Sequence, residues 1–535
     1  MLRAKKPHGR VTARATRRFV GGALLIAALT TLGVSVAVIE GINTIADAFS
    51  RGELVTSADL TPAQAGRPQT IMIVGSDKRY GSKDLIDRTN PPHTDTILLV
   101  RLDPGAGDVT VMSVPRDLLV PKFTFRGQTY LNNKINFAYS VGSEFGHTKT
   151  AADQLTLDVV KHALGGIEIN DFIDLNFNTF EQVVTKLGCV YVDVDHDFFH
   201  RNYPGEPSAQ NYEAINIRPG YKSLCGNTAL AYVRYRHDDN TFARDARQQD
   251  FLRQAKDQLG VTGLLNHYQD ILGALGKSIS TNIHTSTQVA RLVLLLFDTL
   301  GRPVRQVQFP DNPIQVQTVN GLQDDQTASK SEIRATVAKF ESSSASFSSL
   351  PGSSRPPASS GSGSGGSGGS GSGTGTHHHR APRVPAGIAG LSTMPTSMRD
   401  RALQMAPTLP FPVELPTLNY DWSAQVEGPL DYYAYRVRDL AHKEHWAYHV
   451  TWQDTKVAGA WYGMEGTNWT NPPLFAHADT RYHGGRAYLE VGNGHHIQDI
   501  GWIEHGVLYW INNTLFDDLS NAQMVALAES SRPVA

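Results

Sequence analysis

Arginine side chains, with a glutamine among them, gather near the middle of the chain at spacings that could surround a phosphorylated ligand. The helical pattern there makes Arg244 and Gln248 neighbours at i,i+4 and predicts Leu252 and Ala255 on an apolar face. Guanidinium groups bind phosphate oxygens through paired hydrogen bonds, and a diphosphate offers many such oxygens. A solvated, salt-bridged helix is the alternative interpretation, because acidic residues alternate with the arginines.

The segment before this helix carries two further arginines. If residues 231–236 are extended, Arg234 and Arg236 point to the same side of the strand. Together with the helix, this arrangement would direct two pairs of donor side chains to one ligand. The sequence therefore predicts a clamp for a diphosphate.

Two aspartates nearer the N-terminus could hold a cation beside that clamp. Asp77 follows a predicted buried strand at residues 70–74, and Asp95 precedes another at residues 96–102. If these strands are antiparallel neighbours, both carboxylates lie at one edge of the sheet. Such a pair suits Mg²⁺ (or Mn²⁺), which takes its remaining ligands from water and substrate phosphates. Aspartates at strand ends also serve turns alone, so the pair is only a candidate metal site.

Further cationic candidates lie close to these strands. Arg116 comes directly after a predicted strand at residues 109–114 and a proline, so a fixed backbone would hold its guanidinium. Asp117 is either an ion-pair partner that aims Arg116 or a general base. Arg79 and Arg88, between the two aspartates, are weaker candidates for the same phosphate contacts.

Composition limits the class of protein. A chain of 535 residues is long enough for two or three domains. Its net charge of -2 argues against non-specific nucleic-acid binding, which requires a basic surface. The two cysteines, Cys189 and Cys225, are too few for a thiolate metal site. They predict a disulfide if the domain lies outside the cytoplasm, with two free cysteines as the alternative.

The N-terminus predicts export. Residues 1–18 are basic and carry no acid, and Phe19–Ile39 is an uncharged, mostly apolar run of the length that spans a bilayer. Basic flanks stay in the cytoplasm, so we expect a single-pass anchor in the cell membrane with an extracytoplasmic catalytic domain. A cleaved signal peptide, with Ala46-Asp47-Ala48 as the cleavage site, is the alternative.

The remaining chain is predicted to fold as two units. Alternating strands and helices indicate an α/β fold, an α-β-α sandwich with a mixed sheet. Aromatic-rich segments near the C-terminus indicate a smaller α+β domain, mainly antiparallel, whose Trp and Tyr side chains either form its core or stack on sugars. The predicted division is a basic tail at 1–18, a transmembrane helix at 19–40, a stalk at 41–67, a catalytic domain at 68–340, a Ser/Gly/Pro-rich disordered linker at 341–393 that includes His377–His379, and a C-terminal domain at 394–535.

An ordered set of motifs resembles the LytR-CpsA-Psr family across about half of the chain. The matching segments are GSDKR at 75–79, HTDTILLVRLDP at 93–104, SVPRDL at 113–118, NKINFAY at 133–139, FIDLNFNTFEQVVTKLG at 172–188, ALAYVRYRHDD at 229–239 and ARDARQQ at 243–249. The C-terminal unit resembles the extra domain of some actinobacterial members. The insert between Asp77 and Asp95 departs from the family pattern and leaves the roles of Arg79 and Arg88 open.

The resemblance implies transfer of a glycopolymer, such as a teichoic acid or an arabinogalactan-like polymer, from a polyprenyl-pyrophosphate carrier to peptidoglycan. It implies that Asp77 and Asp95 hold Mg²⁺ and that apolar residues of the 172–187 region line a lipid tunnel. The residues that match the family's phosphate-binding positions are Arg116, Arg234, Arg236, Arg244 and Gln248. A pyrophosphatase that uses water as acceptor, and a non-catalytic lipid-carrier or regulatory binding protein, are the alternatives.

Overall fold

The computed structural model describes residues 40–77, 91–146, 148–201, 214–235, 242–258, 279–299, 304–310, 312–318, 321–342, 388–425, 432–457, 459–492 and 496–534. The expected anchor at Phe19–Ile39, most of the expected linker, and the candidates Arg79, Arg88 and Arg236 lie outside these ranges. Within the ranges, no helix is both long enough and apolar enough to cross a membrane.

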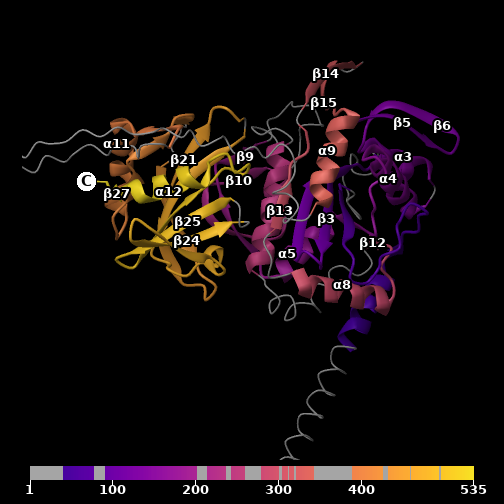
Figure 1. The fold of residues 1–535 in the computed structure, drawn as a ribbon, viewed down its shortest axis with the longest axis horizontal. Helices are drawn as coiled ribbons and strands as arrows, with labels where there is room; N and C mark the ends of the chain where they lie inside the picture. The colour runs from indigo at the N-terminus through magenta and orange to yellow at the C-terminus, as the bar shows by residue number, and fades with distance from the viewer. Residues whose placement is uncertain are drawn as a thin grey trace, which may run out of the picture.

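A seven-stranded mixed sheet forms the centre of the N-terminal domain (Figure 1). Its strand order is β1 (Glu53–Leu54), β12 (Ile279–Thr281), β7 (Asp171–Asn176), β2 (Gln69–Ser76), β3 (Thr94–Asp103), β4 (Asp108–Ser113) and β13 (Val304–Val307). The central pairs β2–β3 and β3–β4 are antiparallel, whereas β2–β7 and β4–β13 are parallel. The predicted α/β fold with a mixed sheet is therefore confirmed.

Helices cover both faces of this sheet, as the alternation of apolar residues requires. In β2, Met72 and Val74 pack beneath α3 (Phe137–Phe145), α4 (Lys149–Ala163) and α9 (Lys330–Glu341). The alternate residues Ile71 and Ile73 contact α8 (Ser286–Thr299) on the other face, because successive strand side chains point to opposite sides. Two hairpins complete this domain, β5 (Leu119–Phe125) with β6 (Gln128–Lys134) and β14 (Pro313–Thr318) with β15 (Gly321–Gln326).

The segment expected to be a stalk is part of the fold. Residues 40–50 form a helix whose Ala46 packs with Ile283 and Val289 of the catalytic domain. Directly after it, β1 pairs in parallel with β12 at the edge of the sheet. The chain therefore joins the catalytic domain within a few residues of the expected anchor.

A smaller layer lies between the sheet and the C-terminal domain (Figure 1). It contains α5 (Phe177–Lys186), β8 (Val190–Val194), β9 (Phe198–His200), β10 (Ile215–Ile217), β11 (Gly220–Leu224), α6 (Gly226–Arg234) and a helix at residues 242–258. Buried residues of these elements form one apolar cluster.

The prediction of an extended segment from residue 231 is wrong for residues 231–234, which belong to α6. Tyr232 and Val233 are buried in the apolar cluster. Their packing favours a helix over the extended segment that was considered for these residues.

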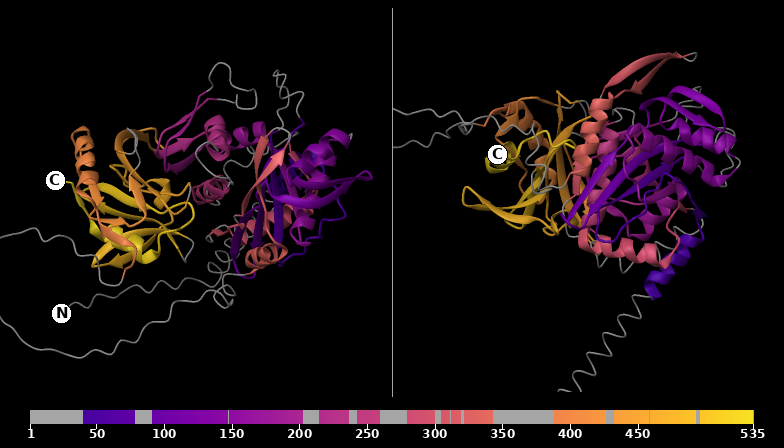
Figure 2. Two further views of the ribbon diagram at one scale, coloured as in Figure 1. Left: turned by 90° about the horizontal axis from the view of Figure 1, so that it is seen from above. Right: turned by 45° about the vertical axis from the view of Figure 1, so that its right-hand side comes forward.

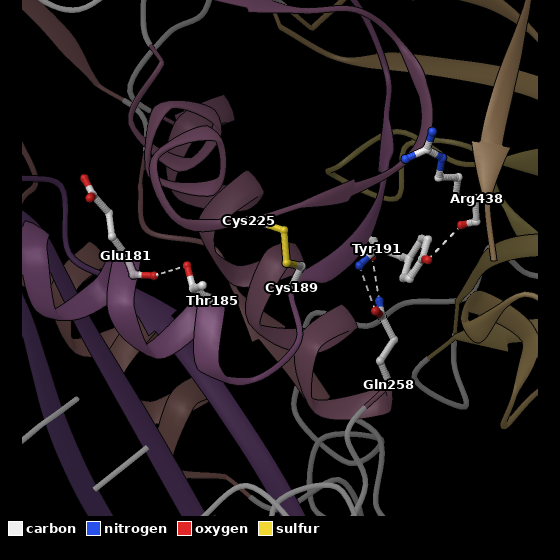
Figure 3. The surroundings of a disulfide bond; sticks show 7 residues. All are labelled: Glu181, Thr185, Cys189, Tyr191, Cys225, Gln258 and Arg438. Atoms are coloured by element: carbon white, nitrogen blue, oxygen red, sulfur yellow. Dashed lines mark hydrogen bonds between the residues drawn. A yellow bond between two sulfur atoms is a disulfide. The ribbon is translucent and has the colours of Figure 1, made fainter. Parts of the chain in front are cut away.

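Cys189 and Cys225 are joined by a disulfide between the end of α5 and the start of α6 (Figure 3). The adjacent residues Val190 and Leu224 begin the antiparallel pairing of β8 with β11. Tyr191, next in β8, donates its backbone N–H to Gln258 Oε1 at 2.8 Å and accepts a hydrogen bond from the same amide. The disulfide, the strand pair and the helix at 242–258 thus hold one another in place.

The C-terminal domain is built on an antiparallel sheet of eight strands, as predicted. Its order is β19 (Ser423–Gln425), β21 (Glu444–Asp454), β22 (Trp461–Thr467), β26 (Val507–Asn512), β25 (Ile497–Glu504), β24 (Arg486–Gly492) and β23 (Asp479–His483), with β20 (Tyr432–Arg438) also paired to β21. Helices α11 (Thr396–Met405) and α12 (Asn521–Ser530) pack on its core, and a capping box of Ser520 and Gln523 begins α12. Trp452, Trp502 and Trp510 are fully buried, which favours the core interpretation for these aromatic residues. The short elements are β16 (Leu391–Thr393), β17 (Glu414–Pro416), β18 (Leu418–Tyr420), β27 (Ser531–Pro533) and the 3₁₀ turns η3 (Ala406–Thr408) and η4 (Pro473–Phe475).

The C-terminal domain docks against β8–β11 of the catalytic domain (Figures 1 and 2). Tyr191 and Tyr221 pack in one buried cluster with Tyr435, Trp469 and Trp510 of the C-terminal domain. Tyr191 Oη donates to the carbonyl of Arg438 at 2.8 Å, and Tyr221 Oη accepts the N–H of Leu474 at 3.0 Å. Aromatic rings and hydrogen bonds therefore join the two domains.

Glycine is required at one point of this contact. Gly220 has a φ of +103°, and a Cβ placed there would lie 2.7 Å from the ring of Tyr435. A larger residue would combine backbone strain with a steric clash, so the docking of β20 on β11 depends on this position.

A half-buried carboxyl near the same interface predicts a pH-dependent stability. Burial raises the pKa of Asp517 from 3.8 to about 7, although Arg253 opposes the shift. Since the folded pKa lies above the unfolded one, the neutral group's contribution is complete below the unfolded pKa and is lost as the pH rises through about 7. Asp517→Asn should therefore raise the free energy of unfolding by about 2–4 kcal/mol at about pH 8 and by almost nothing near pH 4.

Urea unfolding of both chains across this pH range measures the effect, with the exposed Asp479→Asn as the control that should change little. Asp517 has a φ of 56°, a conformation that Asn adopts readily, so the substitution adds no backbone strain. A gain in stability that is equal at all pH values would contradict the assignment to the ionisation of Asp517.

Candidate active site

A β-bulge brings Asp77 and Asp95 together at the end of β2 and β3. The antiparallel register passes from Gly75 opposite Thr96 to Ser76 opposite Thr94, so Asp95 is the extra residue. Asp77 follows at once, and its Oδ1 accepts the backbone N–H of His93 at 2.6 Å. Bulges commonly redirect a side chain beside an active site, and this one directs Asp95 toward the arginines described next.

Asp95 lies between two guanidinium groups. Its Oδ1 pairs with Nη1 of Arg116, and its Oδ2 lies 3.3 Å from Nη2 of Arg234. Arg234 stacks on the ring of Phe177 with its Cζ 3.9 Å from the centroid, which fixes the plane of the guanidinium. The side chains of Arg116 and Arg234 retain 24% and 31% of their exposure, so both can reach a ligand.

The electrostatics of the two aspartates differ. Burial opposes ionisation of Asp95, but Arg116, followed by Arg234 and Arg244, outweighs it and lowers the pKa of Asp95 to about 2. Burial, followed by repulsion from Asp95, raises the pKa of Asp77 to about 6. Asp77 and Asp95 repel each other, even with cationic groups beside them. A cation bound between the two carboxylates would therefore be stabilised.

This donor set fits a divalent cation. Asp77 and Asp95 supply oxygen ligands from adjacent strands, and hard cations such as Mg²⁺ prefer carboxylate oxygens together with phosphate and water. Since Arg116 and Arg234 occupy both oxygens of Asp95, a cation there would share that carboxylate with them. Asp77 and Asp95 are the residues that would hold it.

Asp117 lies in a separate ion-pair network. Lys134 Nζ approaches Asp117 Oδ1 at 2.8 Å and Asp325 Oδ1 at 3.1 Å, and Arg116 Nε lies 3.5 Å from Asp117 Oδ2. Asn136 donates its backbone N–H to the carbonyl of Arg116 at 3.2 Å. Of the two predicted roles for Asp117, this geometry favours the ion-pair partner that aims Arg116 over the general base.

The role of Asp117 can be tested by Asp117→Asn. If Asp117 only aims Arg116, we expect catalytic turnover to fall roughly 10- to 100-fold while the acid limb of the pH–rate profile keeps its position. Lys134→Met, which removes the other side of the ion pair, should have a similar but smaller effect. Loss of the acid limb in Asp117→Asn would show instead that Asp117 is the base.

The helix at residues 242–258 supports the site from behind. Gln248 Nε2 donates to the carbonyl of Val233 at 2.9 Å, and Arg247 Nη1 donates to the carbonyl of Tyr235 at 3.1 Å, so both hold the end of α6 that carries Arg234. Gln249 Nε2 donates to Ser113 Oγ at 2.9 Å, close to Arg116. This helix therefore fixes the positions of Arg234 and Arg116 together.

One prediction about this helix needs correction. Leu252 was expected on the buried apolar face, but it is 39% exposed, while the polar Arg244, Arg247 and Gln248 are buried. The helix turns its polar side inward because the carbonyls of α6 and the acidic partners lie there. Arg244 binds Asp245 Oδ1 at 2.7 Å, so its guanidinium already has an anionic partner within the protein.

Other residues of the site escaped the sequence analysis. Phe177 beneath Arg234 was counted with a lipid-lining region, and Gln249 and Arg247 had no assigned role. Tyr139 Oη donates to Asp174 Oδ2 at 2.8 Å between α3 and β7, beside the bulged end of β2. Their only sequence signal was their place in the NKINFAY, FIDLNFN and ARDARQQ motifs.

Comparisons with known proteins agree with this architecture. The model of the LytR_cpsA_psr family matches residues 35–339. TagV of Bacillus subtilis (strain 168), named a polyisoprenyl-teichoic acid–peptidoglycan teichoic acid transferase, is 28% identical over 247 residues, 46% of this chain and 57% of the relative. Biofilm regulatory protein A of Streptococcus mutans serotype c is 26% identical over 238 residues, 44% of this chain and 54% of the relative. The chain thus spans little more than half the length of these relatives.

Among solved structures, the crystal structure of TagV from B. subtilis covers 52% of this chain and 97% of its own, with 22% identity and a TM-score of 0.40. The domain is a mixed sheet between helices, with a bulge that presents two aspartates to arginines. The family model covers more than half of the 535 residues, and the chain belongs to the LytR-CpsA-Psr family.

Proposed function

We propose that this chain is a phosphotransferase that moves a glycopolymer from a polyprenyl-pyrophosphate carrier to peptidoglycan. The observation that carries the proposal is the cluster of Asp77, Asp95, Arg116 and Arg234 at the β2–β3 bulge, partly open to solvent. Relatives named as teichoic acid transferases support transfer to peptidoglycan.

The chemistry follows from the charges in this site. A hydroxyl of the acceptor sugar attacks the phosphorus attached to the glycan, the bond from that phosphorus to the bridging oxygen breaks, and polyprenyl phosphate leaves with the negative charge. Arg116 and Arg234 bind the phosphoryl oxygens on which charge accumulates, and Phe177 keeps Arg234 in plane. A divalent cation held by Asp77 and Asp95 would neutralise further phosphate charge when bound. The proton of the acceptor hydroxyl passes to solvent or to a general base.

We also propose that the site lies outside the cytoplasm, close to the cell membrane. The basic residues 1–18 and the apolar Phe19–Ile39 support a single-pass anchor in the cell membrane with the catalytic domain outside the cytoplasm. The disulfide between Cys189 and Cys225 is consistent with an oxidising exterior. A lipid-linked donor and peptidoglycan would both be within reach of such a domain.

The test is a transfer assay with the full-length chain in detergent. A polyprenyl-pyrophosphoryl oligosaccharide, Mg²⁺ and peptidoglycan fragments are incubated with the wild type, Arg234→Ala, Arg234→Lys and the exposed Arg481→Ala, and products are followed by mass spectrometry. We expect the wild type and Arg481→Ala to join sugar phosphate to peptidoglycan. Arg234→Ala should lose most of this activity, and Arg234→Lys should recover part, because lysine supplies the charge without the planar pair of donors.

Two outcomes would reject the proposal. Release of free sugar phosphate without an adduct would identify a pyrophosphatase that uses water as acceptor. Tight binding of the lipid donor without turnover, whichever of Mg²⁺ and Mn²⁺ is supplied, would identify a non-catalytic binding protein.

A further inference from the structure

A second group of ligand-type side chains lies where the two domains meet, far along the chain from the bulge. Asp193 of β8 belongs to the catalytic domain, and His449 of β21 and Glu465 of β22 belong to the C-terminal domain. One ligand atom from each lies within 4.8 Å of the other two. Among the residues that the structure describes, no other set of three His, Cys, Asp or Glu side chains meets this condition.

The outward oxygens of the two carboxylates are held by neighbours. Trp510 Nε1 donates to Asp193 Oδ2 at 2.9 Å, and Tyr435 Oη donates to Glu465 Oε2 at 2.5 Å. The backbone N–H of Tyr221 also reaches Glu465 Oε2, at 3.2 Å. Metal sites use such outer hydrogen bonds to orient their ligands.

The inward atoms face one another. His449 Nδ1 lies 3.1 Å from Glu465 Oε1, close to the ~3.3 Å edge of a tetrahedron with zinc–ligand bonds of ~2.0–2.1 Å. His449 and Glu465 are fully buried. Three ligand atoms that converge in a buried contact between two domains have the arrangement of a metal site.

The ligand set also suits a divalent ion in its charge. Two carboxylates and one imidazole around a single ion in this interior would balance its two positive charges. Lys222 lies over the ring of Tyr435 at 4.7 Å.

We propose that Asp193, His449 and Glu465 form a zinc site that joins the C-terminal domain to the catalytic domain. One nitrogen and two carboxylate ligands suit Zn²⁺ better than Mg²⁺, which prefers oxygen ligands alone. A solvent molecule completes a four-coordinate ion. The site is independent of the proposed transfer reaction, and its role is to stabilise the contact between the domains.

The experiment measures zinc binding by the full-length chain in detergent. Because His377–His379 could bind zinc themselves, all chains carry alanine at these three positions. After removal of metal with EDTA, zinc is titrated in excess Mg²⁺, and the bound metal is counted by mass spectrometry. We expect about one tightly bound zinc per chain and a higher melting temperature in its presence.

Three substitutions separate the site from other zinc ligands. Glu465→Gln keeps the shape of the side chain but should abolish tight binding. Tyr435→Phe, which removes the hydrogen bond to Glu465 and the acceptor of the Tyr221 backbone N–H, should weaken it roughly 10- to 100-fold. Glu490→Gln alters a different His–Glu pair in the same domain, that of His483, and should leave zinc binding unchanged.

Absorption of the Co²⁺-substituted wild type provides a measurement that depends on no variant, and intense bands of tetrahedral cobalt are expected. Equal zinc binding by the wild type and Glu465→Gln would overturn the proposal. So would a wild type that binds no zinc, in which case a proton shared between Asp193 and Glu465 occupies the cluster.

Discussion

Asp95→Asn is expected to reduce glycopolymer transfer by roughly 10³-fold, the largest effect of any single substitution in the site. Asparagine is neutral, so it cannot pair with Arg116 and Arg234 or serve as a strong ligand for a divalent cation. The two guanidinium groups would lose the anion that places them on either side of the bulge. The assay described above measures the loss as initial rates of adduct formation.

The control for this substitution lies on the same strand. Asp103 ends β3, where its Oδ1 accepts the backbone N–H groups of Gly105 and Ala106 at 3.0 Å each. An asparagine oxygen can accept both bonds, so Asp103→Asn should keep near-normal activity. Retention of more than about a tenth of the activity in Asp95→Asn would show that the bulge is not the catalytic centre.

Replacing both Cys189 and Cys225 with serine is expected to lower the free energy of unfolding by about 4 kcal/mol. The two cysteines are separated by 36 residues in sequence, and the chain-entropy model assigns this value to a loop of that length. The loss should fall on β8, β11 and the start of α6, the helix that ends in Arg234. Transfer activity should therefore decline at temperatures at which the wild type is still folded.

Urea unfolding with and without a reducing agent separates the disulfide from the side chains. The reduced wild type should unfold at the same urea concentration as the double variant, and the double variant should not respond to reduction. A double variant as stable as the oxidised wild type would mean that strand pairing alone holds this region together.

Much of the catalytic domain could be predicted because its signals are local. The strands β2, β3, β4 and β8 are apolar runs that end at polar turns, and the antiparallel pairing of β2 with β3 places Asp77 beside Asp95 as predicted. The bulge itself could not be predicted, since it depends on the register between two strands separated by an insert. The same holds for the hydrogen bond from Gln249 to Ser113, which joins residues 136 positions apart.

Local patterns failed where packing decides the structure. An extended segment was considered for residues 231–236, yet Tyr232 and Val233 are buried in an apolar cluster as part of a helix. The exposure of Leu252 has a related origin, because polar partners on α6 draw the arginines of the next helix inward. The cluster of Asp193, His449 and Glu465 had no local signal at all, since its members come from two domains.

The helix at residues 40–50 and strand β1 have a mechanical consequence for an enzyme at a membrane. With Phe19–Ile39 in the bilayer, as proposed, the chain enters the folded domain almost as soon as it leaves the lipid. Such a short connection would limit how far the domain can swing and would restrict the height of the bulge above the headgroups. A lipid carrier satisfies that geometry simply by diffusing in the membrane, whereas the wall strand that accepts the glycan has to approach the membrane surface. The distance between the membrane surface and the bulge would thus be set by the way residues 40–54 pack against the sheet and its helices.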